Sequence, residues 1–223
     1  LSPITPRLYS ISSSPKSHPR EVHLTVAIVK YNNFERDRFG LATGDLSNRI
    51  EVNKTRIPVY IQPTKEFVIP EDGSKDIIMI GPGTGIAPFR AFLEQRIEEN
   101  GTGRNWLFFG EVHEKSTFFY KDEWFEAMKN GHLQKLTTAF SRDQEHKIYV
   151  QHRLIGNSKE VWKWLQSGSY FYVCGDKQYM AKDVHSALIE IAQKEGKLKK
   201  EDAENYINQT LMKDERRYLR DVY

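Results

Sequence analysis

The sequence predicts an α/β protein in which a doubly wound, five-stranded parallel sheet follows a smaller, β-rich part. Two observations predict this fold. After residue 76, short continuous apolar runs alternate with helical patterns, which is typical of parallel strands buried on both faces. Before residue 70, apolar and polar residues alternate in short runs between turn residues, which is typical of half-exposed antiparallel strands. We therefore expect two domains, residues 1–70 and 71–223, divided near the turn-rich segment 70–76.

The first part contains two predicted strands and one helix. Segment 21–31 places Val22, Leu24, Val26 and Ile28 on one face, as an amphipathic strand does. Segment 56–62 is a second, shorter β-rich run, and segment 40–50, entered through a glycine, is the one helix-like stretch between them.

The second part alternates strands with helices throughout its length. Trp106, Phe108 and Phe109 read as strand core, and Met180, Val184, Leu188 and Ile191 recur at helical spacing as core contacts. The predicted strands are 77–80, 106–110, 133–141, 170–175 and 216–223. The first predicted helix follows strand 77–80 and ends at Asn100, and the others are 120–131, a helix around 160–166, and 178–196.

Composition excludes several classes of protein. The net charge of +3 over 223 residues is too small and too scattered for a nucleic-acid surface. No apolar run is long enough to span a bilayer, so we expect no membrane partner. The single cysteine, Cys174, excludes an internal disulfide and suits the reducing cytoplasm. The seven histidines form no HExxH motif, and one cysteine allows no CxxC motif, so we expect no metal site.

A glycine-rich stretch, GPGTGIAPFRAF (81–92), lies where a buried strand ends and a helix begins. This is the place where a doubly wound sheet binds ligands, and its glycines let an anion approach the free amides of the first helical turn. The stretch lacks the Gly-Lys-Ser/Thr of nucleotide-hydrolysing loops, which favours a pyrophosphate over a triphosphate. A tight turn without a ligand is the alternative.

A second polar cluster follows the third strand of the α/β part. Segment 140–151 supplies Ser141, Arg142, Lys147 and Tyr149 within a few residues. Arginine, lysine and a hydroxyl suit a 2′-phosphate, and an aromatic face suits adenine. A ribose diol would instead favour an acidic residue, so the cluster favours NADPH over NADH. A solvated charged loop is the alternative.

Taken in order, these motifs resemble the ferredoxin–NADP reductase modules of diflavin reductases, and the resemblance extends over the whole chain. The terminal tyrosine is similar to that of the flavoproteins of assimilatory NADPH sulfite reductase, where cytochrome P450 reductases carry tryptophan. The matching motifs are RLYS (7–10), GLAT (40–43), GPGTGIAPFRAF (81–92), SRD (141–143), KIYVQ (147–151), YVCGD (172–176), MAKDV (180–184) and RRYLRDVY (216–223).

The resemblance implies FAD and NADP(H) as cofactors and assigns residues to each. Ser10, Cys174, Asp221 and Tyr223 would surround the reacting rings, with Tyr223 stacked on the flavin until nicotinamide displaces it. FAD would be bound by Arg7, Leu8, Tyr9, Ser10, Thr25, Val26, Ala27, Tyr31, Gly40, Leu41, Ala42, Thr43 and Tyr223. NADP would be bound by Gly83, Thr84, Ser141, Arg142, Lys147, Ile148, Tyr149, Val150, Gln151 and Asp183.

The function implied by the resemblance is hydride transfer from NADPH to FAD. The electrons would then pass through FMN, held in a flavodoxin-like domain absent from this chain, to a siroheme sulfite reductase subunit. The barrel strands that precede RLYS in the family are missing and the sequence starts at Leu1, so we expect a piece of a longer protein with an incomplete FAD barrel. A P450-reductase-type diflavin enzyme and a catalytically incomplete NADP-binding fragment are the alternatives.

Overall fold

A five-stranded parallel sheet forms the centre of the protein in the computed structural model, which describes residues 5–223. The strand order β5-β4-β3-β6-β7 places the first strand of the sheet in the middle, with the chain winding outward in both directions. The predicted doubly wound fold is therefore confirmed. The strands are β3 (Ile77–Ile80), β4 (Asn105–Glu111), β5 (Lys135–Phe140), β6 (Tyr170–Gly175) and β7 (Tyr218–Val222).

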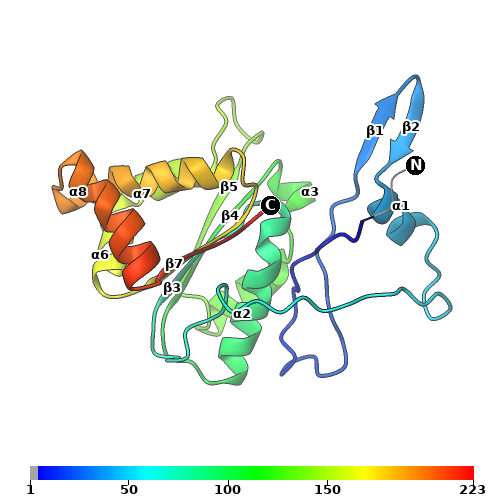
Figure 1. The fold of residues 1–223 in the computed structure, drawn as a ribbon, viewed down its shortest axis with the longest axis horizontal. Helices are drawn as coiled ribbons and strands as arrows, with labels where there is room; N and C mark the ends of the chain where they lie inside the picture. The colour runs from blue at the N-terminus through cyan, green and yellow to red at the C-terminus, as the bar shows by residue number, and fades with distance from the viewer. Residues whose placement is uncertain (1–4) are drawn as a thin grey trace.

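Helices cover both faces of this sheet (Figure 1). One face packs against α2 (Ala87–Glu98) and α4 (Lys121–Lys129), and a short α3 (Glu114–Thr117) follows β4. The other face packs against α5 (Val150–Gly156), α6 (Ser158–Gln166), α7 (Met180–Gly196), α8 (Lys200–Asn205) and the π-helical segment Tyr206–Asp214.

No helix within residues 5–223 is long and apolar enough to cross a membrane.

Each central strand is buried on both faces, which explains the continuous apolar runs. In β3, Ile78 and Ile80 face the α5–α7 side, whereas Ile77 and Met79 face the α2 side. Successive side chains of a strand point to opposite faces, so a strand between two helical layers has no polar face. The predicted core residues Trp106, Phe108, Phe109, Val184, Leu188 and Ile191 are all buried, and Met180 packs against the core from its edge.

The strands of the N-terminal part lie elsewhere than the sequence predicted. Of segment 21–31 only the end joins a strand, β1 (Lys30–Asn33), which pairs with β2 (Arg36–Phe39); Leu24 forms a single bridge with Ile11. Segment 56–62 forms no strand. Strands over residues 21–29 and 56–62 are absent because, within residues 5–223, no strand lies beside either stretch to exchange backbone hydrogen bonds. The predicted helix is present as α1 (Leu41–Asn48).

The sequence reading also missed α5, which begins at Val150 inside the stretch read as a binding loop. Val150 and Leu154 are buried in the core on the α7 side of the sheet. Only two buried residues mark this seven-residue helix, which is too short a pattern for helical periodicity to emerge.

We expect the two parts to differ sharply in their contribution to stability. Val173→Ala, at a fully buried position in β6, should lower the free energy of unfolding by about 2–3 kcal/mol because it removes two buried methyl groups and leaves a cavity. Val59→Ala, at a position that is 82% exposed, should change it by less than about 0.5 kcal/mol. Urea unfolding of both variants tests this, and equal losses would contradict the fold described here.

Candidate functional site

The glycine loop packs directly on the end of β6. Its 3₁₀ turn, Gly83–Ile86, leads from β3 into α2, and Gly83 has a left-handed φ of +57°. A Cβ atom on Gly85 would lie 2.1 Å from the carbonyl oxygen of Cys174, and one on Gly81 would lie 2.6 Å from the ring of Phe89. Since real side chains cannot approach so closely, these positions require glycine, and the bare backbone sits at the carboxyl edge of the sheet.

The 3₁₀ turn that leads into α2 supplies the donors that a phosphate needs. The amides of Gly85 and Ala87 donate to the carbonyls of Pro82 and Thr84, whereas the first amides of the turn, those of Gly83 and Thr84, have no backbone acceptor among residues 5–223 and are free to bind an anion. Pro88 lies in the first turn, where its missing N–H costs no hydrogen bond. Gly83 and Thr84 are both partly exposed, so the loop fits the pyrophosphate of a dinucleotide.

Three predicted catalytic residues meet beside this loop. Cys174 in β6 and Asp221 in β7 are paired in register, so their side chains lie on the same face. The Asp221 carboxylate accepts a hydrogen bond from Ser10 Oγ at 3.1 Å and lies 3.9 Å from Cys174 Sγ. Burial, followed by the charge of Asp221, raises the pKa of the Cys174 thiol to about 12. The cysteine is therefore a neutral thiol at physiological pH.

The terminal tyrosine lies against the same loop. The amide of Tyr223 donates to the Gly175 carbonyl, and its own carbonyl accepts from the Lys177 amide, so the chain end is fixed to the edge of β6. Its hydroxyl lies 3.1 Å from Thr84 Oγ1, while the residue is 63% exposed. The ring therefore lies over the loop with much of its surface open to solvent.

The predicted 2′-phosphate cluster lies at the carboxyl edge, next to the end of β4. The amides of Ser141 and Arg142 donate to the carbonyls of Glu111 and Val112, which fixes the start of the segment. Arg142 and Lys147 are exposed, and neither side chain forms an ion pair with another residue in the range 5–223. Their positive charges are therefore not neutralised by this part of the chain.

The remaining predicted NADP residues lie where β5 leads into α5. Tyr149 is the N-cap residue of α5 and is 42% exposed, so its ring is accessible. Gln151 Nε2 donates to Asp183 Oδ2 at 3.0 Å, which brings together two candidates from α5 and α7. Ile148 packs against the core and Val150 is buried, so Val150 could offer a ligand only its backbone.

The predicted FAD residues are only partly brought together. Arg7 is exposed and donates to the carbonyl and hydroxyl of Thr5, its own neighbour; Leu8 is also exposed and Tyr9 is half-buried. Thr25 Oγ1 lies 2.6 Å from the hydroxyl of Tyr120 in the α/β part. Next to it, Val26 is partly buried, whereas Ala27 and Tyr31 are exposed.

The predicted FAD-phosphate turn forms the start of α1. Gly40 donates its amide to the Val29 carbonyl, and Thr43 Oγ1 accepts from the Val29 amide at 3.1 Å. The amides of Leu41 and Ala42 lie in the first helical turn, where no partner exists within the helix. This donor set fits a second pyrophosphate, that of FAD.

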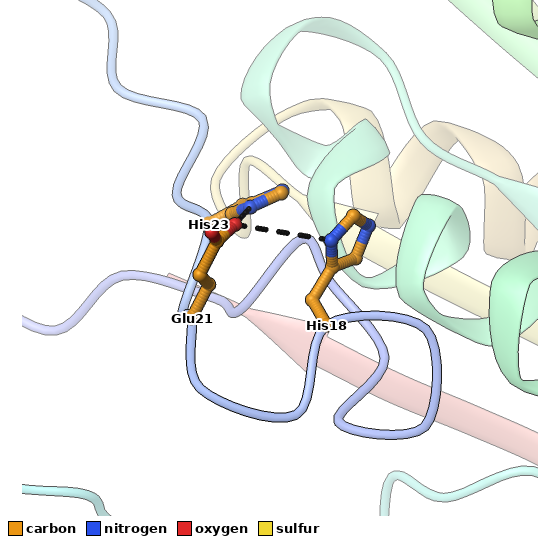
Figure 2. Close-up of side chains that lie close together, drawn as sticks. All are labelled: His18, Glu21 and His23. Atoms are coloured by element: carbon orange, nitrogen blue, oxygen red, sulfur yellow. Dashed lines mark hydrogen bonds and ion pairs between the residues drawn. The ribbon is translucent and has the colours of Figure 1, made fainter.

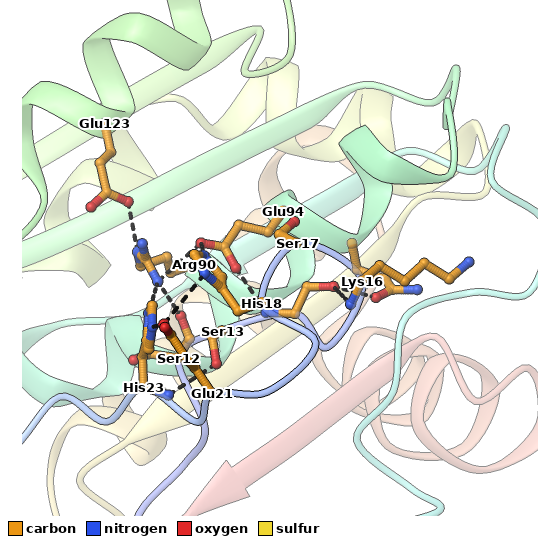
Figure 3. A network of polar contacts seen from close by, with 12 residues as sticks. Ser12, Ser13, Lys16, Ser17, His18, Glu21, His23, Arg90, Glu94 and Glu123 are labelled. Carbon is orange, nitrogen blue, oxygen red and sulfur yellow. Dashed lines mark hydrogen bonds and ion pairs between the residues drawn. The ribbon is translucent and has the colours of Figure 1, made fainter.

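Arg90 was missed by the sequence reading, although it joins the two parts (Figure 3). Its guanidinium donates to the Ser12 carbonyl at 2.7 Å, pairs with Glu94 at 3.0 Å and Glu123 at 2.6 Å, and lies over the ring of Tyr120. The available signal was a charged residue directly after the buried Phe89 of α2.

Comparison with known families identifies two domains in the chain. Residues 79–186 match the oxidoreductase NAD-binding domain, and residues 1–44 match the FAD binding domain. The first match spans the glycine loop and the segment 141–151, and the second spans Ser10 and the start of α1.

Comparison with curated proteins finds relatives over the full chain, each named sulfite reductase [NADPH] flavoprotein alpha-component. The protein of Mannheimia succiniciproducens is 50% identical over 223 residues, which is 100% of this chain and 37% of the relative. That of Vibrio parahaemolyticus is 48% identical over 220 residues (99% and 35%), and that of Shewanella oneidensis is 47% identical over 223 residues (100% and 36%). The chain thus spans little more than a third of the relatives that it matches.

The raised pKa of Cys174 predicts a loss of stability at alkaline pH. The thiol ionises near pH 9.0 in the unfolded chain and near pH 12 in the folded one. The contribution of the protonated thiol to the free energy of unfolding is therefore complete below pH 9 and is lost as pH rises towards 12. Wild type should therefore lose up to about 1.4 kcal/mol per pH unit more than Cys174→Ala in this window. Urea unfolding of both proteins from pH 8 to pH 11 measures the difference between their free energies of unfolding. The ionisation of buried tyrosines affects both proteins equally and cancels in this difference. Parallel curves of the two free energies against pH would contradict the prediction.

Proposed function

We propose that the chain, which matches an FAD binding domain and an oxidoreductase NAD-binding domain, transfers hydride from NADPH to FAD. The observation that carries the proposal is the meeting of Ser10, Cys174 and Asp221 beside the glycine loop. Ser10 comes from the FAD-binding match, whereas Cys174 lies in the NAD-binding match. A site built from both domains suits a reaction between their two cofactors.

NADPH would lie along the carboxyl edge of the sheet. The amides of Gly83 and Thr84, at the start of the 3₁₀ turn, would bind its pyrophosphate. Ser141, Arg142 and Lys147 would bind the 2′-phosphate, and Tyr149 would face the adenine. The exposed, unpaired charges of Arg142 and Lys147 support this assignment, because a phosphate dianion would be their partner.

FAD would be held by the N-terminal part. The amides of residues 41–43 would bind its pyrophosphate, Ser10 would lie near the flavin ring, and Arg7 would turn from Thr5 to the phosphates. When bound, FAD supplies a ring that accepts hydride at N5. The protein's contribution is to align the two rings and to control the electrostatics around them.

The charge of Asp221 suits the electrostatic role. A carboxylate beside the nicotinamide would stabilise the positive charge that the ring gains as hydride leaves. Ser10 holds this carboxylate in place, and the neutral thiol of Cys174 adds no second negative charge beside it. Tyr223 would cover the flavin until nicotinamide displaces it, since stacking is worth only about 1 kcal/mol.

We place this chain in an NADPH sulfite reductase flavoprotein. Electrons would pass from FAD to FMN in a flavodoxin-like domain, and from there to a siroheme sulfite reductase subunit in the cytoplasm. The printed name shared by the relatives supports this placement over a cytochrome P450 reductase. The chain's coverage of only about a third of each relative leaves room for the FMN domain elsewhere in such a protein.

Anaerobic spectroscopy tests the function and its preference for NADPH together. With FAD added, the chain should become yellow, and NADPH should bleach the flavin band. The double variant Arg142→Ala/Lys147→Ala should require about 10–100-fold more NADPH for half-maximal bleaching, because charge-assisted bonds to the 2′-phosphate are lost, whereas its response to NADH should not change.

Lys129→Ala, an exposed lysine at the end of α4, is the matched control and should behave as wild type. A chain that binds FAD but is not bleached by NADPH would refute hydride transfer. Equal effects of the double variant on NADPH and NADH would refute the assignment of the 2′-phosphate.

A further inference from the structure

Three potential metal ligands lie together on the loop that packs against α2. His18, Glu21 and His23 each offer one ligand atom, and these three atoms all lie within 4.8 Å of one another. Figure 2 shows both imidazole rings beside the Glu21 carboxylate. The spacing His-x2-Glu-x-His matches neither the HExxH nor the CxxC motif, so only the three-dimensional structure indicates this cluster.

The distances between the ligand atoms suit a small divalent ion. A tetrahedral Zn²⁺ bound at about 2.0–2.1 Å holds its ligand atoms about 3.3 Å apart. His23 Nε2 lies 2.8 Å from Glu21 Oε2, and His18 Nδ1 lies 3.9 Å from the same oxygen. Small rotations of these exposed or half-exposed side chains would equalise the two distances.

Glu94 of α2 prepares His18 for a metal. His18 Nε2 lies 3.3 Å from Glu94 Oε1, so this nitrogen carries the proton and donates it. In the neutral ring the lone pair of His18 is then on Nδ1, which faces Glu21. A carboxylate that binds the far nitrogen of a histidine ligand is the usual support of a metal site, because it fixes the tautomer and raises the basicity of the ligand.

Arg90 has one contact that metal binding would break, but its positive charge does not cancel the negative charge of the cluster. Its NH1 lies 3.2 Å from His23 Nδ1, a contact that would break when the ring proton moves to Nδ1 on metal binding. The guanidinium retains Ser12, Glu94 and Glu123 as partners. With both histidines neutral, the charges of Glu21, Glu94, Glu123 and Arg90 leave the cluster at −2, which one divalent cation neutralises.

We propose that His18, Glu21 and His23 bind a divalent transition-metal ion of the Zn²⁺ class, with Glu94 as the supporting carboxylate. Nitrogen ligands from two histidines select such an ion over Mg²⁺ or Ca²⁺, which prefer oxygen. The ion would cross-link three residues within the loop of residues 12–23, which the contact of His18 with Glu94 joins to α2. The remaining coordination position is open to water on the exposed side.

Calorimetric titration of the chelator-treated chain with ZnCl₂, in the absence of NADPH and FAD, tests the site. Wild type should bind a single Zn²⁺ per chain. His18→Ala, Glu21→Gln and His23→Ala should each weaken binding about tenfold or more, and Glu94→Gln, which keeps the shape of the supporting residue, about tenfold. Substitution of Co²⁺ should give the intense visible bands of a tetrahedral site, and these should disappear in His23→Ala.

His113→Ala is the matched control, because His113 pairs with Asp143 on the surface as another histidine–carboxylate pair, 2.8 Å apart. It should bind Zn²⁺ as wild type does. Circular dichroism of each variant verifies that it is folded. Absence of saturable binding, or binding that the three ligand substitutions leave unchanged while His113→Ala weakens it, would overturn the proposal and leave a network of ion pairs in its place.

Discussion

The close contact between Gly85 and the Cys174 carbonyl is the constraint on which the site depends. It sets the glycine loop directly on the end of β6, where a single methyl group would collide with the backbone. The same strand end carries Cys174, pairs with Asp221 of β7 and holds the amide of Tyr223. The proposed phosphate donors and the residues proposed to lie beside the reacting rings are thus fixed to one rigid edge, as alignment for hydride transfer would require.

A second requirement is that the N-terminal part be fastened to this edge. Arg90 follows the glycine loop by one helical turn and binds the Ser12 carbonyl, two residues after Ser10. Ser14 adds hydrogen bonds to Glu94 and Gln95 farther along α2. The helix α2, which begins at the glycine loop, therefore also positions Ser10 against Asp221. The proposed metal site lies on the same loop, and its ion would cross-link residues 18, 21 and 23 within it.

The sequence predicted the α/β part well and the N-terminal part poorly, for one physical reason. Runs such as Ile77–Ile80 form strands because their neighbours are in the chain, and periodicity then suffices. Segments 21–29 and 56–62 have strand periodicity but no neighbouring strand within residues 5–223. The Ser10–Asp221 contact followed only from a family resemblance, since 211 positions separate the two residues. Arg90 and the His18–Glu21–His23 cluster depend on tertiary packing that no local pattern records.

The most direct measurement of the central claim compares Gly85→Ala with Gly156→Ala. A Cβ on Gly156 meets nothing within 4 Å, whereas one on Gly85 meets the Cys174 backbone. Calorimetry with 2′,5′-ADP should show binding lost, and the melting temperature lowered, in Gly85→Ala alone. Unchanged affinity and stability in Gly85→Ala would show that the loop does not depend on the end of β6, and the account of the site would fail.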